Sequence, residues 1–284
     1  MKRLKTVGRL ALYTLIFIIS SALAGVFIAN LYSLFVFFGA DSVPLDIFII
    51  ENLGLTVIIS GILIIVFGGL TLVARGINPL KYLDFKRISL KDSAASLMMG
   101  IGFSLFVSCL LTLVKLDTVI PDTVSEEMME AIAANFPLIL LAIGVVVPFY
   151  EEFFFRGLIF KELQRSSKLW IAVVLQGLIF GAFHLNWFQF IYTFPAGIVM
   201  GLVFLRYRSI WTSILIHLGW NTTSTLLSLP DDLPLSGFVG LLLLGAGLLF
   251  AGLYYTYNIR PKAIELEESE PIGPGEPIIE GETL

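Results

Sequence analysis

The sequence is short of charge. Of its 284 residues, 14% are Asp, Glu, Lys or Arg and 57% are hydrophobic, whereas an average globular domain carries about a quarter charged residues. This composition excludes an ordinary soluble domain and indicates a chain surrounded by lipid. The single cysteine, Cys109, excludes an internal disulfide framework. Membrane lipid is therefore an expected partner, and nucleic acid is not.

The sequence also lacks the alternation of polar and apolar residues that a membrane-spanning β-barrel needs. Its apolar runs are continuous instead, and a helical span requires about 20 apolar residues. Eight segments are candidate spans: 10–39, 52–74, 94–114, 136–155, 169–187, 191–205, 209–228 and 237–258. The division between the fifth and the sixth rests on a short polar break at Asn186–Gln189. We predict an all-α, polytopic membrane bundle with about eight transmembrane helices.

Lysine and arginine are sorted by side under this assignment. With the N-terminus in the cytoplasm and eight crossings, every one of the 18 Lys and Arg residues except Lys115 falls on the cytoplasmic side. Cytoplasmic loops of membrane proteins carry such an excess. The prediction is an integral, multi-pass protein with both termini cytoplasmic.

Three regions can be distinguished along the chain. Residues 1–260 are expected to form one transmembrane helical bundle. Within them, residues 76–92 mix basic and apolar side chains, as a segment lying on the inner leaflet does. Residues 261–284 are rich in Glu, Pro and Gly and are expected to form a disordered, acidic cytoplasmic tail.

Three of the predicted spans contain polar residues that are costly in lipid. An ionisable group inside a span costs at least about 2.5–3.5 kcal/mol on insertion scales. The fourth, fifth and seventh spans together hold Glu151, Glu152, Arg156, His184, His217 and Asn221. Each could have a structural role alone, as a helix-end charge cluster, a core histidine or an interhelical clamp. Several such residues on three helices favour one functional site.

Helical spacing divides the two carboxylates. Glu152 and Arg156 are four residues apart and can pair on one helix face, whereas Glu151 is rotated by about 100° from Glu152. One carboxylate is then structural, and the other is available for chemistry. His217 and Asn221 share a helix face by the same spacing.

Two further residues shape the surroundings. Pro148 removes a backbone hydrogen bond just before the carboxylates and is expected to kink the helix. Irregular backbone at membrane depth needs a cavity, which can admit water. Phe180 lies one turn before His184 and is expected to pack beside it.

These residues occur in three motifs: Glu151-Glu152-Phe-Phe-Phe-Arg156, Phe180-Gly-Ala-Phe-His184 and His217-Leu-Gly-Trp-Asn221. In this order they resemble the CPBP family of intramembrane proteases, also called the Abi or bacteriocin-processing family, which includes the type II CAAX prenyl endopeptidases. The matching residues lie within 148–221, and the resemblance implies a catalytic core over about 136–228. It also implies an intramembrane endopeptidase that hydrolyses peptide bonds of membrane-associated or prenylated (CAAX-type) substrates.

The resemblance further implies that Glu151 and His184 polarise the attacking water and that His217 and Asn221 stabilise the oxyanion. The residue types agree, since peptide hydrolysis needs a base near a water and donors for the oxyanion. No cofactor is expected, because the chain has no His-Glu-x-x-His motif and no third histidine. If a metal does take part, Glu151, His184 and His217 are the expected zinc ligands.

Two other functions stay open. A non-catalytic membrane protein of the same fold, such as a bacteriocin self-immunity factor, is compatible with the resemblance but would tolerate loss of the polar residues. A proton- or cation-coupled transporter using Glu and His relays is disfavoured, because the polar residues form one cluster and no inverted repeat is visible. The substrate is not specified: prenylated proteins, pheromone or bacteriocin precursors and regulatory membrane proteins all fit.

Overall fold

The structure, a computed structural model, describes residues 2–39, 43–118, 120, 133, 135–227 and 233–259. Over these ranges the regular elements are all helices, and no strand occurs among them. The predicted all-α fold class is confirmed. The predicted acidic tail, residues 261–284, lies outside the described residues.

Six helices in the described part of the chain are long and apolar enough to cross a membrane. They are α1 (Lys2–Phe37), α3 (Leu53–Ala74), α5 (Leu90–Leu113), the continuous helix Phe136–Gln164, α11 (Trp187–Tyr207), and α13 (Leu235–Tyr254) with its π-helical end η4 (Tyr255–Ile259). Two shorter helices, α10 (Leu169–Ala182) and α12 (Ile210–Leu226), occupy the predicted fifth and seventh spans. Each of the eight predicted segments thus falls on a helix, and the chain is an integral, multi-pass membrane protein.

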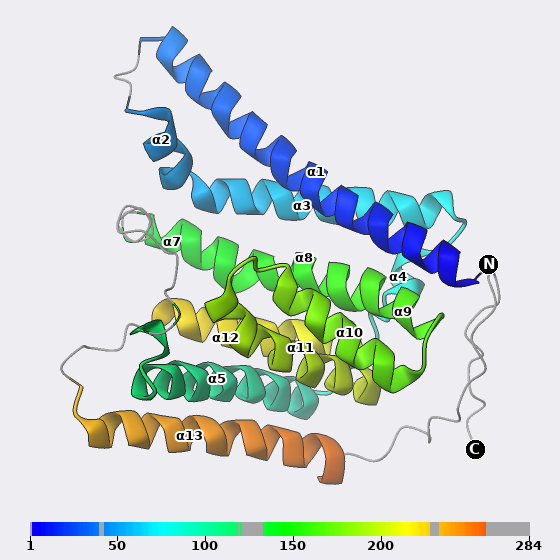
Figure 1. The fold of residues 1–284 in the computed structure, drawn as a ribbon, viewed down its shortest axis with the longest axis vertical. Helices are drawn as coiled ribbons and strands as arrows, with labels where there is room; N and C mark the ends of the chain where they lie inside the picture. The colour runs from blue at the N-terminus through cyan, green and yellow to red at the C-terminus, as the bar shows by residue number, and fades with distance from the viewer. Residues whose placement is uncertain are drawn as a thin grey trace.

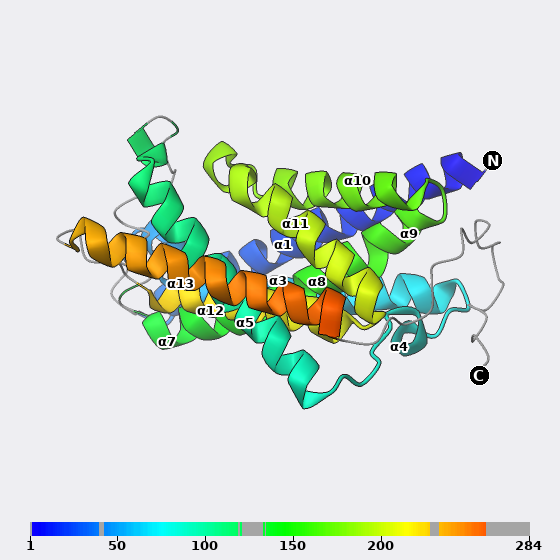
Figure 2. The same ribbon diagram turned by 90° about the horizontal axis from the view of Figure 1, so that it is seen from below.

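Short elements connect these helices: α2 (Leu45–Glu51), α4 (Pro79–Tyr82) and η1 (Leu116–Thr118). The long helices lie side by side (Figure 1), with α1 and α3 together at one edge and α13 beside α5 at the opposite edge. The helix Phe136–Gln164, α10, α11 and α12 lie between these two pairs. Seen from below, α5 crosses behind α13 (Figure 2). The three motifs are therefore carried by the central helices.

Close helix contact in the centre depends on glycine. A Cβ added to Gly100 of α5 would overlap the backbone oxygen of Ile216 on α12, and a Cβ added to Gly219 would lie 3.4 Å from the Cα of Gly100. The backbones of the two helices therefore touch, as small residues allow in membrane proteins. Because Ile216 precedes His217, this contact fixes the helix that carries two predicted site residues. By contrast, a Cβ added to Gly247 on α13 meets no atom within 4 Å.

The helix Phe136–Gln164, which carries both predicted carboxylates, alternates α- and π-helical stretches. In chain order these are α7 (Phe136–Ile139), η2 (Leu140–Val146), α8 (Val147–Glu152), η3 (Phe153–Phe160) and α9 (Lys161–Gln164). Wide π-turns are rare and occur mostly at functional sites. Pro148 follows the first of them, and proline has no N–H to donate to a carbonyl one turn earlier.

Candidate active site

Two hydrogen bonds connect α12 to the helix Phe136–Gln164 about one turn before Pro148. The Nδ2–H of Asn221 donates to the carbonyl oxygen of Ile143 at 3.0 Å, and the hydroxyl of Thr222 donates to that of Gly144 at 3.2 Å. These two carbonyls lie five and four residues before the proline, where a π- or α-helical N–H would otherwise bond. Because proline has no N–H, these carbonyl oxygens are free to accept from Asn221 and Thr222.

Glu152 is the buried member of the carboxylate pair. Its Oε1 accepts from Nη1 of Arg156 at 2.8 Å and from Nδ1 of His217 at 2.9 Å. Arg156, whose side chain is as fully buried as that of Glu152, also donates from Nη2 to the carbonyl of Gly197 at 3.2 Å and lies 4.7 Å from the centre of the Phe180 ring. Glu152 therefore links the arginine on its own helix to the histidine on α12.

The contact with Glu152 fixes the orientation of His217. A carboxylate only accepts hydrogen bonds, so Nδ1 of His217 carries a proton. The other ring nitrogen, Nε2, then lies 3.8 Å from Oε2 of Glu151. The indole of Trp220 stacks on the imidazole, with ring centres 5.6 Å apart and planes inclined by 30°. The histidine is held between one carboxylate and one aromatic ring while its second nitrogen faces the other carboxylate.

Glu151 is set apart from its neighbour by its surroundings. Its side chain is 14% exposed, whereas that of Glu152 is fully buried. The Oε2 atoms of both glutamates are buried and have no hydrogen-bond partner among the described residues, so the difference lies in the rest of the side chain. Glu151 is the carboxylate that spacing left without an arginine, and its side chain lines a cavity.

His184 lies in the turn that follows α10 rather than inside a long span. Its Nδ1 donates to the carbonyl oxygen of Phe180 at 2.9 Å, and because a carbonyl only accepts, Nε2 is the nitrogen left for chemistry in the neutral ring. The Phe180 ring meets the imidazoles of His184 and His217 edge-on, at 5.2 and 5.8 Å between ring centres. The predicted packing of Phe180 beside His184 is confirmed.

The turn itself has a clear local cause. Leu185 adopts a left-handed backbone with φ 52°, which ends α10. Asn186 then caps α11 by accepting from the backbone N–H of Gln189 at 3.1 Å. The polar break at Asn186–Gln189 therefore does divide two helices, but the first of them ends at Ala182, earlier than the predicted 187.

One cavity of about 940 Å³ brings most of the predicted site together. Its walls include Glu151, His184, His217 and Asn221. A volume of this size suits a bound ligand or peptide segment, because known ligand sites occupy about 300–1,000 Å³. Glu152 and Arg156 lie behind the wall, which agrees with a supporting role.

The rest of the cavity extends toward the end of α5. Aromatic side chains of Phe188, Tyr192 and Trp220 form part of the wall, and Lys115 and Thr118 lie at the far side. Lys115 is the one basic residue that the charge pattern assigned to the outside. The cavity therefore runs from the carboxylate toward the predicted outer side. Sequence reasoning did not include these lining residues in the site.

The three candidate zinc ligands do not surround one point. A catalytic zinc would need Glu151, His184 and His217 around one point, with water in the fourth position. Among the residues that the structure describes, no group of three or more His, Cys, Asp or Glu side chains is arranged to hold a metal ion. The side chains as placed do not fit the metal, and we derive no step through it. The metal-free mechanism stays a prediction.

This site belongs to a multi-pass membrane protein, and comparison with known proteins shows which family it resembles. Residues 133–223 match the family model of the type II CAAX prenyl endopeptidases, described as Rce1-like. The matched segment covers about a third of the chain and contains all three motifs. The resemblance to this family of membrane proteases is therefore confirmed.

Curated relatives agree with that match. The chain is 29% identical over 108 residues to the UPF0177 protein YbdI of Lactococcus lactis (37% of this chain and 57% of the relative). It is 27% identical over 105 residues to the putative membrane peptidase YdiL of Bacillus subtilis (37% and 43%). It is 30% identical over 104 residues to the membrane-embedded CAAX protease MroQ of Staphylococcus aureus (34% and 42%).

These alignments span about half the length of the relatives. No solved structure matches the chain.

Proposed function

We propose that the chain is an intramembrane endopeptidase in which Glu151 activates the water that attacks a peptide bond. The observation that carries this proposal is the unequal placement of two adjacent carboxylates. Glu152 is buried and bonded to Arg156 and His217. Glu151 lines the cavity with a side chain that is 14% exposed, and no arginine among the described residues pairs with it.

Water activation is assigned to Glu151 together with His184. The carboxylate takes the proton from water as the water oxygen bonds to the substrate carbonyl carbon. His184 lines the same cavity, and its Nδ1 bond to the Phe180 carbonyl leaves Nε2 to accept a hydrogen bond from that water. When the intermediate collapses, the C–N bond breaks and the departing amine takes the proton from Glu151.

Oxyanion stabilisation is assigned to α12. Asn221 uses one amide hydrogen on the carbonyl of Ile143, and its NH₂ group has a second hydrogen to donate. Donation by Nε2 of His217 requires a proton on both ring nitrogens, and Glu152, whose Oε1 lies 2.9 Å from Nδ1, supplies the counter-charge. Donors fixed in place in this way act on the charge that develops in the transition state.

The position of the site is the basis for proposing a class of substrate. Glu151 lies on a helix long and apolar enough to cross a membrane, whereas His217 and Asn221 lie on the shorter α12, which occupies a predicted span. The cavity that they line has an aromatic wall. We propose membrane-associated or lipid-modified peptides as substrates, with prenylated CAAX-type proteins as the specific candidate. The names of the relatives YdiL and MroQ, a putative membrane peptidase and a CAAX protease, support this choice.

The test compares membranes that contain wild-type protein with membranes that contain Glu151→Gln. Mass spectrometry of protein N-termini should find one or a few precursors that are cut only by the wild type. Glu51→Gln, which changes an exposed glutamate at the end of α2, is the matched control and should leave cleavage intact. If wild type and Glu151→Gln give the same set of N-termini, the endopeptidase proposal is wrong and a non-catalytic role is favoured.

A further inference from the structure

A second charged cluster lies away from the candidate active site. Glu162 on α9 is fully buried, and three arginines from separate parts of the chain point at its carboxylate. Arg9 of α1 lies 2.9 Å from Oε2, whereas Arg75, just after α3, and Arg165, just after α9, lie 3.0 and 3.1 Å from Oε1. The hydroxyl of Tyr82 donates to Oε1 at 3.4 Å.

The cluster carries more positive than negative charge. Three guanidiniums around one carboxylate leave a formal charge of +2. Lys161, which precedes Glu162 on α9, does not change this balance because it is paired with Asp84 at 2.6 Å. A carboxylate offers about four acceptor positions, fewer than the N–H groups of three guanidiniums. Arg75 also donates from Nη1 to the hydroxyl of Tyr13 at 2.5 Å. Together these acceptors hold the arginines in place without satisfying all of their donors.

The arginines also remain accessible. The side chains of Arg9, Arg75 and Arg165 are 28%, 23% and 26% exposed, although the carboxylate beneath them is fully buried. Arg165 is further held over the ring of Tyr82, at 5.0 Å from its centre. Burial raises the pKa of Tyr82, and the charge of Glu162 adds to that effect, so the phenol stays neutral. The cluster is a rigid cationic surface with a buried anchor.

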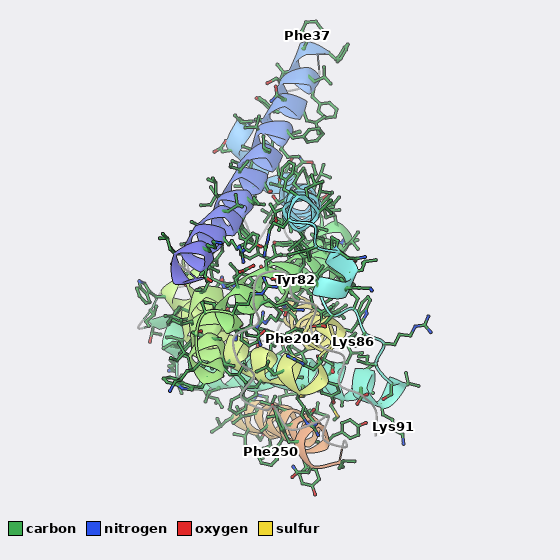
Figure 3. The ribbon with its side chains drawn as sticks, turned by 90° about the vertical axis from the view of Figure 1, so that its right-hand side faces the viewer. Phe37, Tyr82, Lys86, Lys91, Phe204 and Phe250 are labelled. Carbon is green, nitrogen blue, oxygen red and sulfur yellow. The ribbon has the colours of Figure 1, made fainter. Side chains whose placement is uncertain are left out.

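The position of the cluster agrees with contact to lipid headgroups. The N-terminus of α1, α4 and the end of α9 gather at one end of the molecule (Figure 1), which the charge pattern assigns to the cytoplasm. Figure 3 looks onto this end, where the labelled Tyr82 lies inward and Lys91 lies at the outer edge. Apolar side chains next to the cluster face outward, including Val7 of α1 and Trp170 at the start of α10. Exposed tryptophan is typical of the membrane–water interface.

We propose that Arg9, Arg75 and Arg165 bind the phosphate of an anionic phospholipid from the adjacent leaflet. Arginine binds phosphate through paired N–H donors, and the acyl chains would lie along the exposed apolar face of α1. The bound lipid would then join α1, the end of α3 and α9 through one ligand. Since α9 ends the helix that carries Glu151, the site would support the catalytic helix without touching the substrate. This inference does not depend on the proposed protease activity.

The test uses full-length protein in nanodiscs of phosphatidylcholine alone or of an equal mixture with phosphatidylglycerol. After mild delipidation, native mass spectrometry reports which phospholipid stays bound. Wild type should retain phosphatidylglycerol in preference to phosphatidylcholine. Arg165→Gln, which leaves Arg9 and Arg75 on the carboxylate, should weaken that retention roughly tenfold, because one charge-assisted contact is lost. Arg87→Gln changes an exposed arginine on the same predicted side and should have no such effect.

Thermal unfolding separates this site from a purely structural cluster. Phosphatidylglycerol should raise the Tm of wild type and of Arg87→Gln, and should raise that of Arg165→Gln and Arg9→Gln much less. Equal retention of phosphatidylglycerol by wild type and both cluster variants would overturn the proposal, whatever their Tm in phosphatidylcholine. Inorganic phosphate is the remaining arm. If it raises the Tm through the same arginines while phosphatidylglycerol does not, the ligand is a free anion and the lipid assignment is wrong.

Discussion

Glu152→Gln is expected to cost far more stability than Glu151→Gln, although the two residues are adjacent. Oε1 of Glu152 holds Arg156 and His217, and the glutamine would leave a fully buried guanidinium without its counter-charge. Removing one partner of a buried ion pair costs about 3–5 kcal/mol. The side chain of Glu151 is 14% exposed and pairs with no arginine among the described residues, so Glu151→Gln should change the unfolding free energy by less than about 1 kcal/mol.

The assay is reversible unfolding of purified protein in mixed micelles, followed by loss of helical circular dichroism. A rescue variant tests whether the loss of stability comes from the unpaired buried charge. Replacing the pair by apolar side chains, as in Glu152→Leu with Arg156→Met, removes both buried charges and should recover most of the lost stability. It should not recover peptide cleavage, because His217 would still lack the carboxylate that orients it. Equal destabilisation by Glu151→Gln and Glu152→Gln would refute the division of roles.

Further outcomes are expected from the same reasoning. A topology reporter fused after Ser167 should report the cytoplasmic side and one after Ser236 the outer side, and an outer signal at Ser167 would show the span assignment to be wrong. His217→Ala should lower kcat by about 10²–10³ with little change in KM, as loss of one transition-state donor does; a change confined to KM would contradict that role. Gly100→Ala should lower the Tm and the cleavage rate, because its Cβ overlaps the backbone of α12. Gly247→Ala on α13, where an added Cβ meets no atom within 4 Å, should do neither. Elemental analysis of purified protein should find no stoichiometric zinc, and about one zinc per chain, lost in both His184→Ala and His217→Ala, would overturn the metal-free prediction.

The positions of the spans followed from apolar runs because lipid imposes continuous hydrophobicity on every crossing helix. The C-terminal end of α10 was harder to predict. Phe183 and Leu185 continue the apolar run beyond Ala182, so the run does not show where the helix stops. The stop depends on the left-handed backbone at Leu185 and the cap at Asn186, which only the polar break hinted at.

The site was predictable where its contacts are local. The pairing of Glu152 with Arg156 and the packing of Phe180 beside His184 both follow from a spacing of one helical turn. The contact of Glu152 with His217 joins residues 65 positions apart, and no local pattern encodes it. A usable signal existed, since a histidine in an apolar run needs an acceptor for its ring N–H.

The π-helical turns around the carboxylates were not predicted either. The sequence of this helix has apolar residues on all of its faces, so no periodicity in it reveals a change from α- to π-helical winding. Pro148 predicted a missing backbone bond, and the structure shows a widened helix whose carbonyls at Ile143 and Gly144 accept from α12.

The central claim is that Glu151 is the base that activates water for peptide cleavage. Its most direct test is the kcat of Glu151→Gln on a precursor identified from membranes, with both proteins reconstituted in the same lipid vesicles. Loss of a general base predicts a fall of about 10²–10⁴ in a protein whose unfolding free energy is nearly unchanged. A folded Glu151→Gln variant that cleaves the precursor at the wild-type rate would contradict the account.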